Sequence, residues 1–142
     1  MAMRLHIIAR GKIGRSPESE LVDRYLKRIS WPTKHSELPD KGGELPASDS
    51  PYKTIILDEK GAQLTSVELA RLLERWRDDG VREVRFLIGA ADGFDDTARA
   101  SADKLIAFGT ATWPHLMARA MLAEQLFRAT SIIANHPYHR EG

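Results

Sequence analysis

The last eight residues of this 142-residue chain bring several chemically active side chains together. His136 and His139 flank Tyr138, and Arg140 follows directly. Histidine titrates nearest to neutral pH and can move protons, while the guanidinium of arginine binds phosphates and other anions. Chain ends are normally frayed and polar, but Pro137 stiffens this one and an apolar stretch precedes it. We therefore expect the tail to form part of a functional site.

A metal ion or a hydrolytic triad would be another use for such residues. Zinc needs three or four ligands, and His6, His35 and His115 lie in contexts unrelated to the two tail histidines. The chain has no cysteine, so it has no thiolate ligand, no disulfide and no thiol nucleophile. It also lacks a Gly-x-Ser-x-Gly element. We therefore expect no metal site and no hydrolase of these types.

Composition indicates an ordinary globular protein. The chain is 42% hydrophobic and 29% charged, and its length suits one hydrophobic core, which we place in a single domain over residues 1–142. No apolar run approaches the length of a membrane span, and the N-terminus lacks the apolar region of a signal peptide. We expect a cytoplasmic protein with no membrane partner.

The net charge of +1 is unevenly distributed. Residues 1–34 carry eight lysines and arginines against three acids, a net charge of +5, which leaves −4 over residues 35–142. A basic first third can follow a phosphate backbone, although such an excess also arises on the solvated face of a helix. Charge alone leaves both interpretations open.

Strands and helices alternate along the sequence. Apolar runs predict strands over residues 4–10, 52–58, 83–89 and 105–109, with a short edge strand near residues 37–38. Capping residues and apolar spacing predict helices that begin after Ser16 and Thr65, a short helix over 97–103, and a long helix over about 114–130. Such alternation is typical of a parallel sheet covered by helices on both faces, and residues 39–51 read as a loop. The long helix should turn six residues inward: Met117, Met121, Leu122, Gln125, Leu126 and Ala129.

Ligands of parallel sheets bind beyond the carboxyl ends of the strands. Three loops should therefore meet there, at residues 57–58, 89–93 and 109–114. The loop from Gly89 to Gly93 allows close approach to the backbone, but it is neither a dinucleotide fingerprint nor a phosphate loop. The small residues of 109–114 can offer backbone groups to the edge of a purine, or can simply lead a strand into a helix. Each loop by itself is a weak signal.

Several segments taken together resemble the RlmH family, which are ribosomal RNA large-subunit pseudouridine N3-methyltransferases of the SPOUT superfamily. They are FLIGAADG (86–93), TWPHLMAR (112–119), AEQLFRA (123–129) and NHPYHR (135–140), with IIARGK (7–12) and IILD (55–58) upstream. The resemblance covers nearly the whole chain in the same order. No single motif decides it, but the combination is specific.

This resemblance implies an α/β fold of the SPOUT type: a parallel-rich sheet flanked by helices, with a C-terminal trefoil knot that pattern reasoning alone would not propose. It implies S-adenosyl-L-methionine as cofactor and a homodimer with the long helix at the interface and a substrate site shared between subunits. The implied substrate is a pseudouridine in 23S rRNA of assembled ribosomes. Carried over position by position, the cofactor-binding residues are Leu57, Gly89, Phe108, Gly109, Thr110, Ala111, Thr112 and Trp113.

Methyl transfer from a sulfonium is an in-line displacement, which orientation catalyses, and the nitrogen nucleophile must lose its proton. His136 or His139 is the candidate for handling that proton, with Tyr138 as a partner for the base. Arg140 should hold a phosphate or the developing anion. Arg119 and Arg128 could do the same or pair across the dimer, and we favour a structural role for both.

Two departures from the family pattern keep other functions open. Ala90 stands where the family has a second glycine, and the loop at 39–51 replaces a helix. One alternative is a non-catalytic ribosome-associated RNA-binding or assembly factor with the same fold. The other is a nucleotide-binding α/β enzyme that uses Gly89–Gly93, although the lysine of a phosphate loop is missing.

Overall fold

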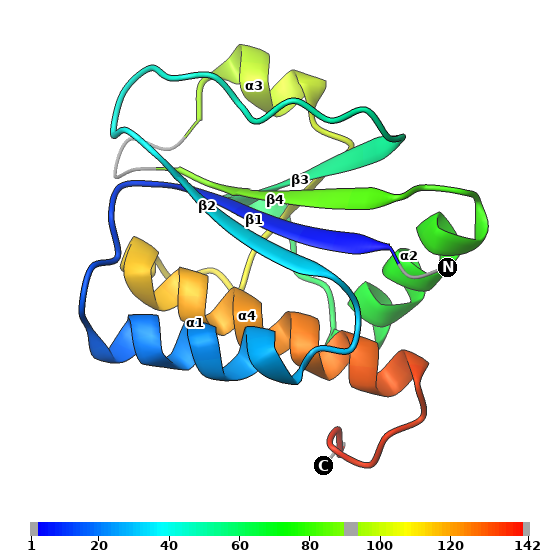
Figure 1. The fold of residues 1–142 in the computed structure, drawn as a ribbon. Coiled ribbons are helices and arrows are strands. Elements are labelled where there is room, and N and C mark those ends of the chain that lie inside the picture. Colours follow the sequence, from blue (N-terminus) through cyan, green and yellow to red (C-terminus); the bar gives the residue numbers. More distant parts are fainter. Residues whose placement is uncertain (1–2, 90–93, 141–142) are drawn as a thin grey trace.

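Five parallel strands form the centre of the protein in a computed structural model, which describes residues 3–89 and 94–140 (Figure 1). Their order across the sheet is β2-β1-β4-β3-β5, and every pairing is parallel. The strands are β1 (Arg4–Arg10), β2 (Thr33–Leu38), β3 (Tyr52–Ala62), β4 (Glu83–Ile88) and β5 (Lys104–Ile106). The predicted parallel α/β sheet is confirmed, with β2 and β5 at its two edges, and β2 is longer than the short strand expected near residues 37–38.

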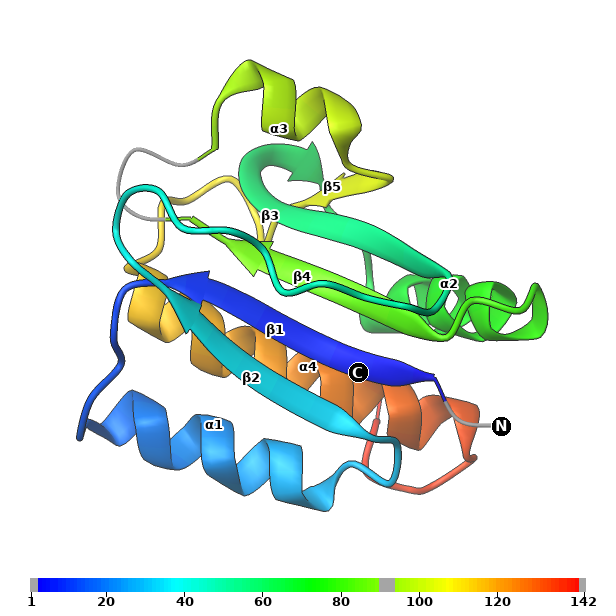
Figure 2. The ribbon, with the colours of Figure 1, turned by 45° about the horizontal axis from the view of Figure 1, so that its top comes forward.

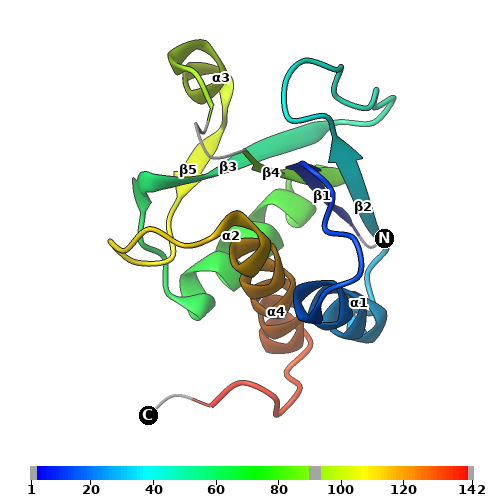
Figure 3. The same ribbon diagram turned by 90° about the vertical axis from the view of Figure 1, so that its left-hand side faces the viewer.

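Helices cover the two faces unequally (Figures 1 and 3). One face is covered by α1 (Pro17–Arg28), α2 (Ser66–Asp78) and α4 (His115–Ile133), and the other by α3 (Asp96–Ser101) and the loop after β2. The main core lies under the three longer helices, where Ile7 and Phe86 of the sheet are buried in one cluster with Leu73 and Leu126. A smaller cluster of Ile8, Ile56 and Leu87 lies on the face toward α3.

Side-chain caps begin the helices near the predicted positions. Ser16 accepts from the backbone N–H of Ser19 at the start of α1, and Thr65 and Glu68 form the capping box of α2. Helix α3 begins at Asp96, one residue before the predicted start, because the Asp95 side chain accepts from the Ala98 N–H. It ends at Ser101 instead of residue 103.

The region around β3 and β5 differs from the prediction. Strand β3 does not end at Asp58 but curls and continues to Ala62 (Figure 2). There the carbonyl of Ala62 accepts from the Ala107 N–H at 2.9 Å. Strand β5 spans only Lys104–Ile106, not 105–109, and Gly109 has a φ of +89°, a left-handed conformation that no strand adopts. Residues 107–114 are therefore a loop.

Helix α4 confirms part of the predicted inner face. Leu122, Leu126 and Ala129 are buried, whereas Met117 is 42% exposed, so its inward placement was wrong. The buried stripe of α4 is centred on Leu122 and Leu126, and Met117 lies on the outer side of the helix.

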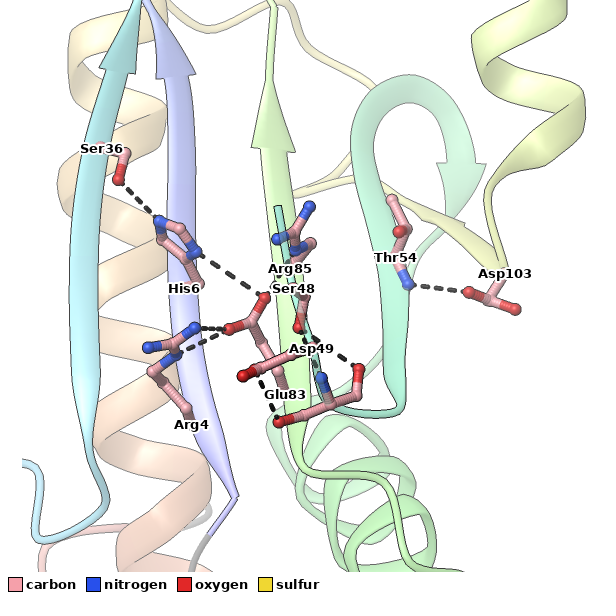
Figure 4. Close-up of polar contacts among 10 residues, drawn as sticks. Arg4, His6, Ser36, Ser48, Asp49, Thr54, Glu83, Arg85 and Asp103 are labelled. Carbon is pink, nitrogen blue, oxygen red and sulfur yellow. Dashed lines mark hydrogen bonds and ion pairs between the residues drawn. The ribbon is translucent and has the colours of Figure 1, made fainter. Parts of the chain in front are cut away.

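A buried ionic cluster lies on the face of the sheet away from the long helices (Figure 4). Glu83 accepts from Nε of Arg4 and from Nε of Arg85, each at 2.6 Å, and Nε2 of His6 lies 2.7 Å from Ser36 Oγ. Burial raises the pKa of Glu83, but the hydrogen bonds from the two arginines outweigh it and hold that pKa below its usual range. Burial lowers the pKa of His6 to about 4, so His6 is neutral at neutral pH.

The buried His6 should make the stability of the fold depend on pH. Its folded-state pKa of about 4 lies below its ordinary value of 6.5. Between these two pH values the unfolded chain therefore binds more protons at this histidine than the folded chain does. Lowering the pH from 6.5 to 4 should therefore reduce the free energy of unfolding by up to about 3 kcal/mol. Urea unfolding across this range measures the loss.

The His6→Gln variant should show a flatter pH dependence between 6.5 and 4, whatever its absolute stability. Gln63→Ala is the control, because Gln63 is exposed and has no titratable group, so the slope should be unchanged. Equal slopes for the wild type and His6→Gln would show that His6 does not titrate as described.

Candidate functional site

The carboxyl ends of β3, β4 and β5 surround a hollow of about 620 Å³. This volume lies in the range of small-molecule sites, and its position is where parallel sheets bind ligands. Seven of the eight predicted cofactor-binding residues line it: Leu57, Gly89, Phe108, Gly109, Ala111, Thr112 and Trp113. Thr110 belongs to the same loop but does not line the hollow. Of the predicted loop at 89–93, residues 90–93 lie outside the described residues.

Two hydrogen bonds hold the loop from Phe108 to Trp113, one within the loop and one to β3. Nε1 of Trp113 donates to the Phe108 carbonyl at 2.9 Å, and the Thr112 hydroxyl donates to Glu59 Oε2 at 2.9 Å. Among residues 3–89 and 94–140, the backbone N–H groups of 109–112 donate to no backbone carbonyl. The loop therefore offers unpaired backbone donors, which suit the polar edge of a heteroaromatic ring.

Both signs of charge lie at the wall of the hollow. Nε of Arg99 donates to Asp58 Oδ2 at 2.7 Å, and Glu59 lies beside them. Burial raises the pKa of Asp58, but the Lys60 N–H and the Arg99 guanidinium hold it below its usual range, so Asp58 is ionised at neutral pH. The hollow thus suits a small ligand that has an apolar or aromatic part and carries both positive and negative groups.

Sequence reasoning missed Arg99, Glu59 and His115, all of which line the hollow. Arg99 lies 41 residues from Asp58 in the sequence, and only the fold brings the two together. Glu59 follows the predicted strand end directly, so its place at the carboxyl edge was a signal that could have identified it.

The C-terminal tail folds back along α4, on the side of that helix away from the sheet (Figure 3). The Tyr138 hydroxyl donates to Glu124 Oε2 at 2.8 Å, and its ring lies 4.5 Å from that of Phe127. The Arg128 guanidinium lies 4.7 Å from the Tyr138 ring centroid. Burial, with the hydrogen bond to Glu124, raises the pKa of Tyr138 to about 12. Tyr138 is therefore a neutral phenol that anchors the tail.

The other tail residues differ in exposure. His139 is half-buried, and Nη1 of Arg128 lies 3.1 Å from its Nδ1. His136 and Arg140 are exposed, and Nδ1 of His136 accepts from the Tyr138 backbone N–H at 3.2 Å. The structure therefore brings the four predicted catalytic residues together on one side of α4.

The tail and the first hollow are neighbours but do not form one cavity within a single chain. A second hollow of about 390 Å³ lies between them. It shares Ala107 and Phe108 with the first hollow and reaches Glu124, the residue that binds Tyr138. No tail residue that the structure describes lines the first hollow. The predicted site residues thus form two groups, joined through the middle of α4.

Arg119 is a structural residue, but its contacts lie within one chain and not across a dimer as we expected. It is fully buried, with Nη1 2.6 Å from Glu37 Oε2 and Nη2 within 3.4 Å of the carbonyls of Arg10 and Gly11. Burial and the Arg119 cation lower the pKa of His35 beside it. These contacts tie the first turns of α4 to the ends of β1 and β2 inside one chain, so Arg119 is not available to a phosphate. Arg128 likewise pairs with Glu124 of its own helix.

Two negative findings apply to residues 3–89 and 94–140. No group of three or more histidine, aspartate or glutamate side chains there is arranged to hold a metal ion. No helix in that part of the chain is long and apolar enough to cross a membrane.

Comparisons with known proteins agree with this architecture. A family profile described as predicted SPOUT methyltransferase matches residues 3–139. "Ribosomal RNA large subunit methyltransferase H" of Novosphingobium aromaticivorans is 71% identical over 99% of this chain and 100% of its own length. The protein of the same name from Zymomonas mobilis is 57% identical with the same coverage. A crystal structure of a "probable methyltransferase" from Bordetella pertussis is 13% identical, with a TM-score of 0.57 over 90% of this chain and 95% of that one, and it supports the fold alone.

The shape of the hollow depends on a close backbone crossing at Gly61. A Cβ at this position would lie 2.6 Å from the backbone N of Ile106 and from the carbonyl carbon of Leu105. The curled end of β3 therefore contacts the backbone of β5 directly, with no room for a side chain.

The variant Gly61→Ala should force these two backbones apart and lower the free energy of unfolding by about 1–3 kcal/mol, the usual cost of overpacking. Gly14→Asn is the control, because Gly14 has a φ of +59°, which asparagine tolerates, and no atom lies near its Cβ position. Urea unfolding compares the two. Equal stability of both variants would contradict the close crossing.

Proposed function

The chain belongs to the SPOUT methyltransferase family, and from that membership we propose that it methylates ribosomal RNA of the large subunit. The two relatives named "Ribosomal RNA large subunit methyltransferase H" that are described above match it end to end at 57% and 71% identity. The observation that carries the proposal is the hollow at the carboxyl edge of the sheet, with loop 108–113 as one wall. We also expect the trefoil knot of this family, and the crossing of β3 over β5 at Gly61 is the feature that supports it.

We propose S-adenosyl-L-methionine as the methyl donor, because its chemistry fits the hollow. The unpaired backbone N–H groups of 109–112 suit the edge of an adenine, and Leu57 and Trp113 supply apolar wall. Asp58, Glu59 and Arg99 suit the charged groups of the methionine part. When bound, this cofactor supplies an electrophilic methyl group on a sulfonium.

The residues of the chain then have two tasks. The walls of the hollow hold the methyl group in line with the attacking nitrogen, which is catalysis by orientation. The tail handles the charge at N3 of a pseudouridine, which must lose its proton before it attacks. A base that takes the proton and a donor or cation that holds the resulting anion would both help, and His136, Tyr138, His139 and Arg140 supply such groups.

We propose that the protein acts as a homodimer on 23S rRNA in assembled ribosomes in the cytoplasm. Trp113 and Met117 are each 42% exposed, and the partly exposed Met121 follows Met117 by one turn of α4. Trp113 lines the first hollow and Met121 the second, so large apolar side chains lie on this part of the surface. Exposed apolar groups at a site favour an interface. A second copy over this side of α4 would cover them and bring its tail near the hollow. A dimer also doubles the basic charge of residues 1–34.

Calorimetry with S-adenosyl-L-methionine, followed by methylation of ribosomes that lack the modification, tests this function. The wild type should bind the donor, transfer its methyl group to a large-subunit pseudouridine, and react more slowly with naked rRNA. Absence of donor binding would favour the non-catalytic assembly factor, and binding of ATP in its place would favour a nucleotide-binding enzyme.

A matched pair of glycine variants locates the donor site. Gly109 and Gly42 have φ values of +89° and +74°, and no atom lies within 4 Å of either Cβ position. A β-branched residue strains both equally, but only Gly109 lines the hollow. Gly109→Val should weaken donor binding by about tenfold or more, roughly the 1.4 kcal/mol of one strained contact, whereas Gly42→Val should leave it unchanged. Equal affinities would move the donor site elsewhere.

A further inference from the structure

The loop between β1 and α1, residues 11–16, lies at the same edge of the sheet as the first hollow. Figure 3 looks onto this edge and shows the loop beside the start of α4, with residues 107–114 on the other side of that helix. A Cβ atom at Gly11 would lie 3.9 Å from Cε1 of His115, and His115 lines the hollow. The loop therefore forms part of the rim around the proposed donor site.

Contacts on its inner side hold this loop in one shape. Ile13 packs against the main core, and its backbone N–H donates to Glu37 Oε2 at 2.7 Å. The Ser16 hydroxyl donates to the Ile13 carbonyl at 3.2 Å, and the same side chain caps α1. Glu37 also accepts from Nη1 of Arg119 at 2.6 Å, which ties the loop to α4. A partner would not have to order such a loop, and this lowers the cost of binding.

Two cations on the outer side of the loop are left for a partner. Lys12 and Arg15 are exposed, and neither makes a hydrogen bond or an ion pair with any residue of 3–89 or 94–140. Arg10, at the end of β1, is different, because it donates to the carbonyls of Pro39 and Gly42. The loop thus presents two positive charges that have no direct partner in the described part of the chain.

The acids near the loop do not cancel this charge. Burial raises the pKa of Glu37, but a backbone N–H of the loop and the Arg119 guanidinium hold it below its usual range, so this carboxylate is balanced by Arg119. Asp40, whose Oδ1 would lie 3.1 Å from a Cβ atom at Gly11, is followed directly by the exposed Lys41. The two acids in the first turn of α1 offset the positive end of that helix. The rim therefore keeps an excess of positive charge.

We propose that this loop is a phosphate-binding rim, at which Lys12 and Arg15 contact the backbone of the rRNA next to the target nucleotide. This inference rests on the proposed function, because the phosphates belong to the RNA whose base enters the site. Phosphate contacts fix the register of a nucleic acid without reading its sequence. The two cations hold the ribosome in register and take no part in the transfer of the methyl group.

The basic residues at the other end of α1 supply a matched control. Lys27 and Arg28 are exposed in the last turn of this helix, where cations suit the negative end of the helix dipole. Because α1 connects the parallel strands β1 and β2, its last turn lies at the edge of the sheet opposite to the hollow (Figure 1). Lys27 thus carries the same charge as Lys12 but lies far from the rim.

Steady-state methylation of ribosomes that lack the modification, at several salt concentrations and constant magnesium, tests the proposal. Lys12→Gln and Arg15→Gln should each raise KM for ribosomes by about three- to tenfold and leave kcat within about twofold of the wild type, because each loses one phosphate contact. The slope of log kcat/KM against log salt should become shallower by about 0.7–0.9 for each lost contact. Lys27→Gln should leave KM and the slope unchanged.

Two further measurements separate the charge from the shape of the loop. Lys12→Arg keeps the charge and should keep KM and the salt slope near those of the wild type. Calorimetry with S-adenosylhomocysteine should give the same affinity for all these variants, because neither Lys12 nor Arg15 lines the hollow.

The outcomes are distinguishable. If the wild type binds no donor or methylates no ribosome, the proposed function fails and this inference fails with it. If the wild type is active but Lys12→Gln and Arg15→Gln match Lys27→Gln in KM and salt slope, the inference alone is wrong. A raised KM with an unchanged salt slope would show that the loop contacts something other than phosphate, and a lowered kcat at unchanged KM would place the loop in the chemical step. Either result would overturn the proposal.

Discussion

The close crossing of the β3 end over the backbone of β5 is the constraint on which the site depends. Gly61 lies against Leu105 and Ile106 without a side chain between them, and the Ala62 carbonyl holds the Ala107 N–H (Figure 2). The chain must then leave β5 as the loop that faces the end of β3. The large hollow is therefore formed mainly by the path of the backbone, and the side chains around it add charge and apolar surface.

Helix α4 connects the two groups of functional residues. Its first turns follow the loop that walls the hollow, and Arg119 ties them to Glu37 and to the carbonyl end of β1. A buried ion pair of this kind contributes more to position than to net stability. The second half of the helix holds the tail through Glu124 and Arg128. One rigid element thus sets the distance between the wall of the hollow and the tail histidines.

Local signals in the sequence predict the strands β1 and β4 and the helices α1 and α2, because alternation and caps act within a few residues. The curl of β3, the short β5 and the exposed Met117 depend on contacts between distant segments. The periodicity of apolar residues reflects only local structure, so it could not predict these features. Most residues that line the hollow were predicted from the resemblance to a family. Arg99 was missed, because nothing in the sequence around it indicates that it lines the hollow. The tail histidines were found by residue type, but their contacts with Arg128 and with the Tyr138 backbone depend on the fold.

The central claim is that the hollow between β3, β4 and the loop after β5 holds the methyl donor. A crystal structure of the intact protein with S-adenosylhomocysteine tests it most directly. The account predicts the ligand in that hollow, against Leu57, Gly89 and residues 108–113. Well-defined ligand density at any other place on the protein, with this hollow filled only by solvent, would contradict it.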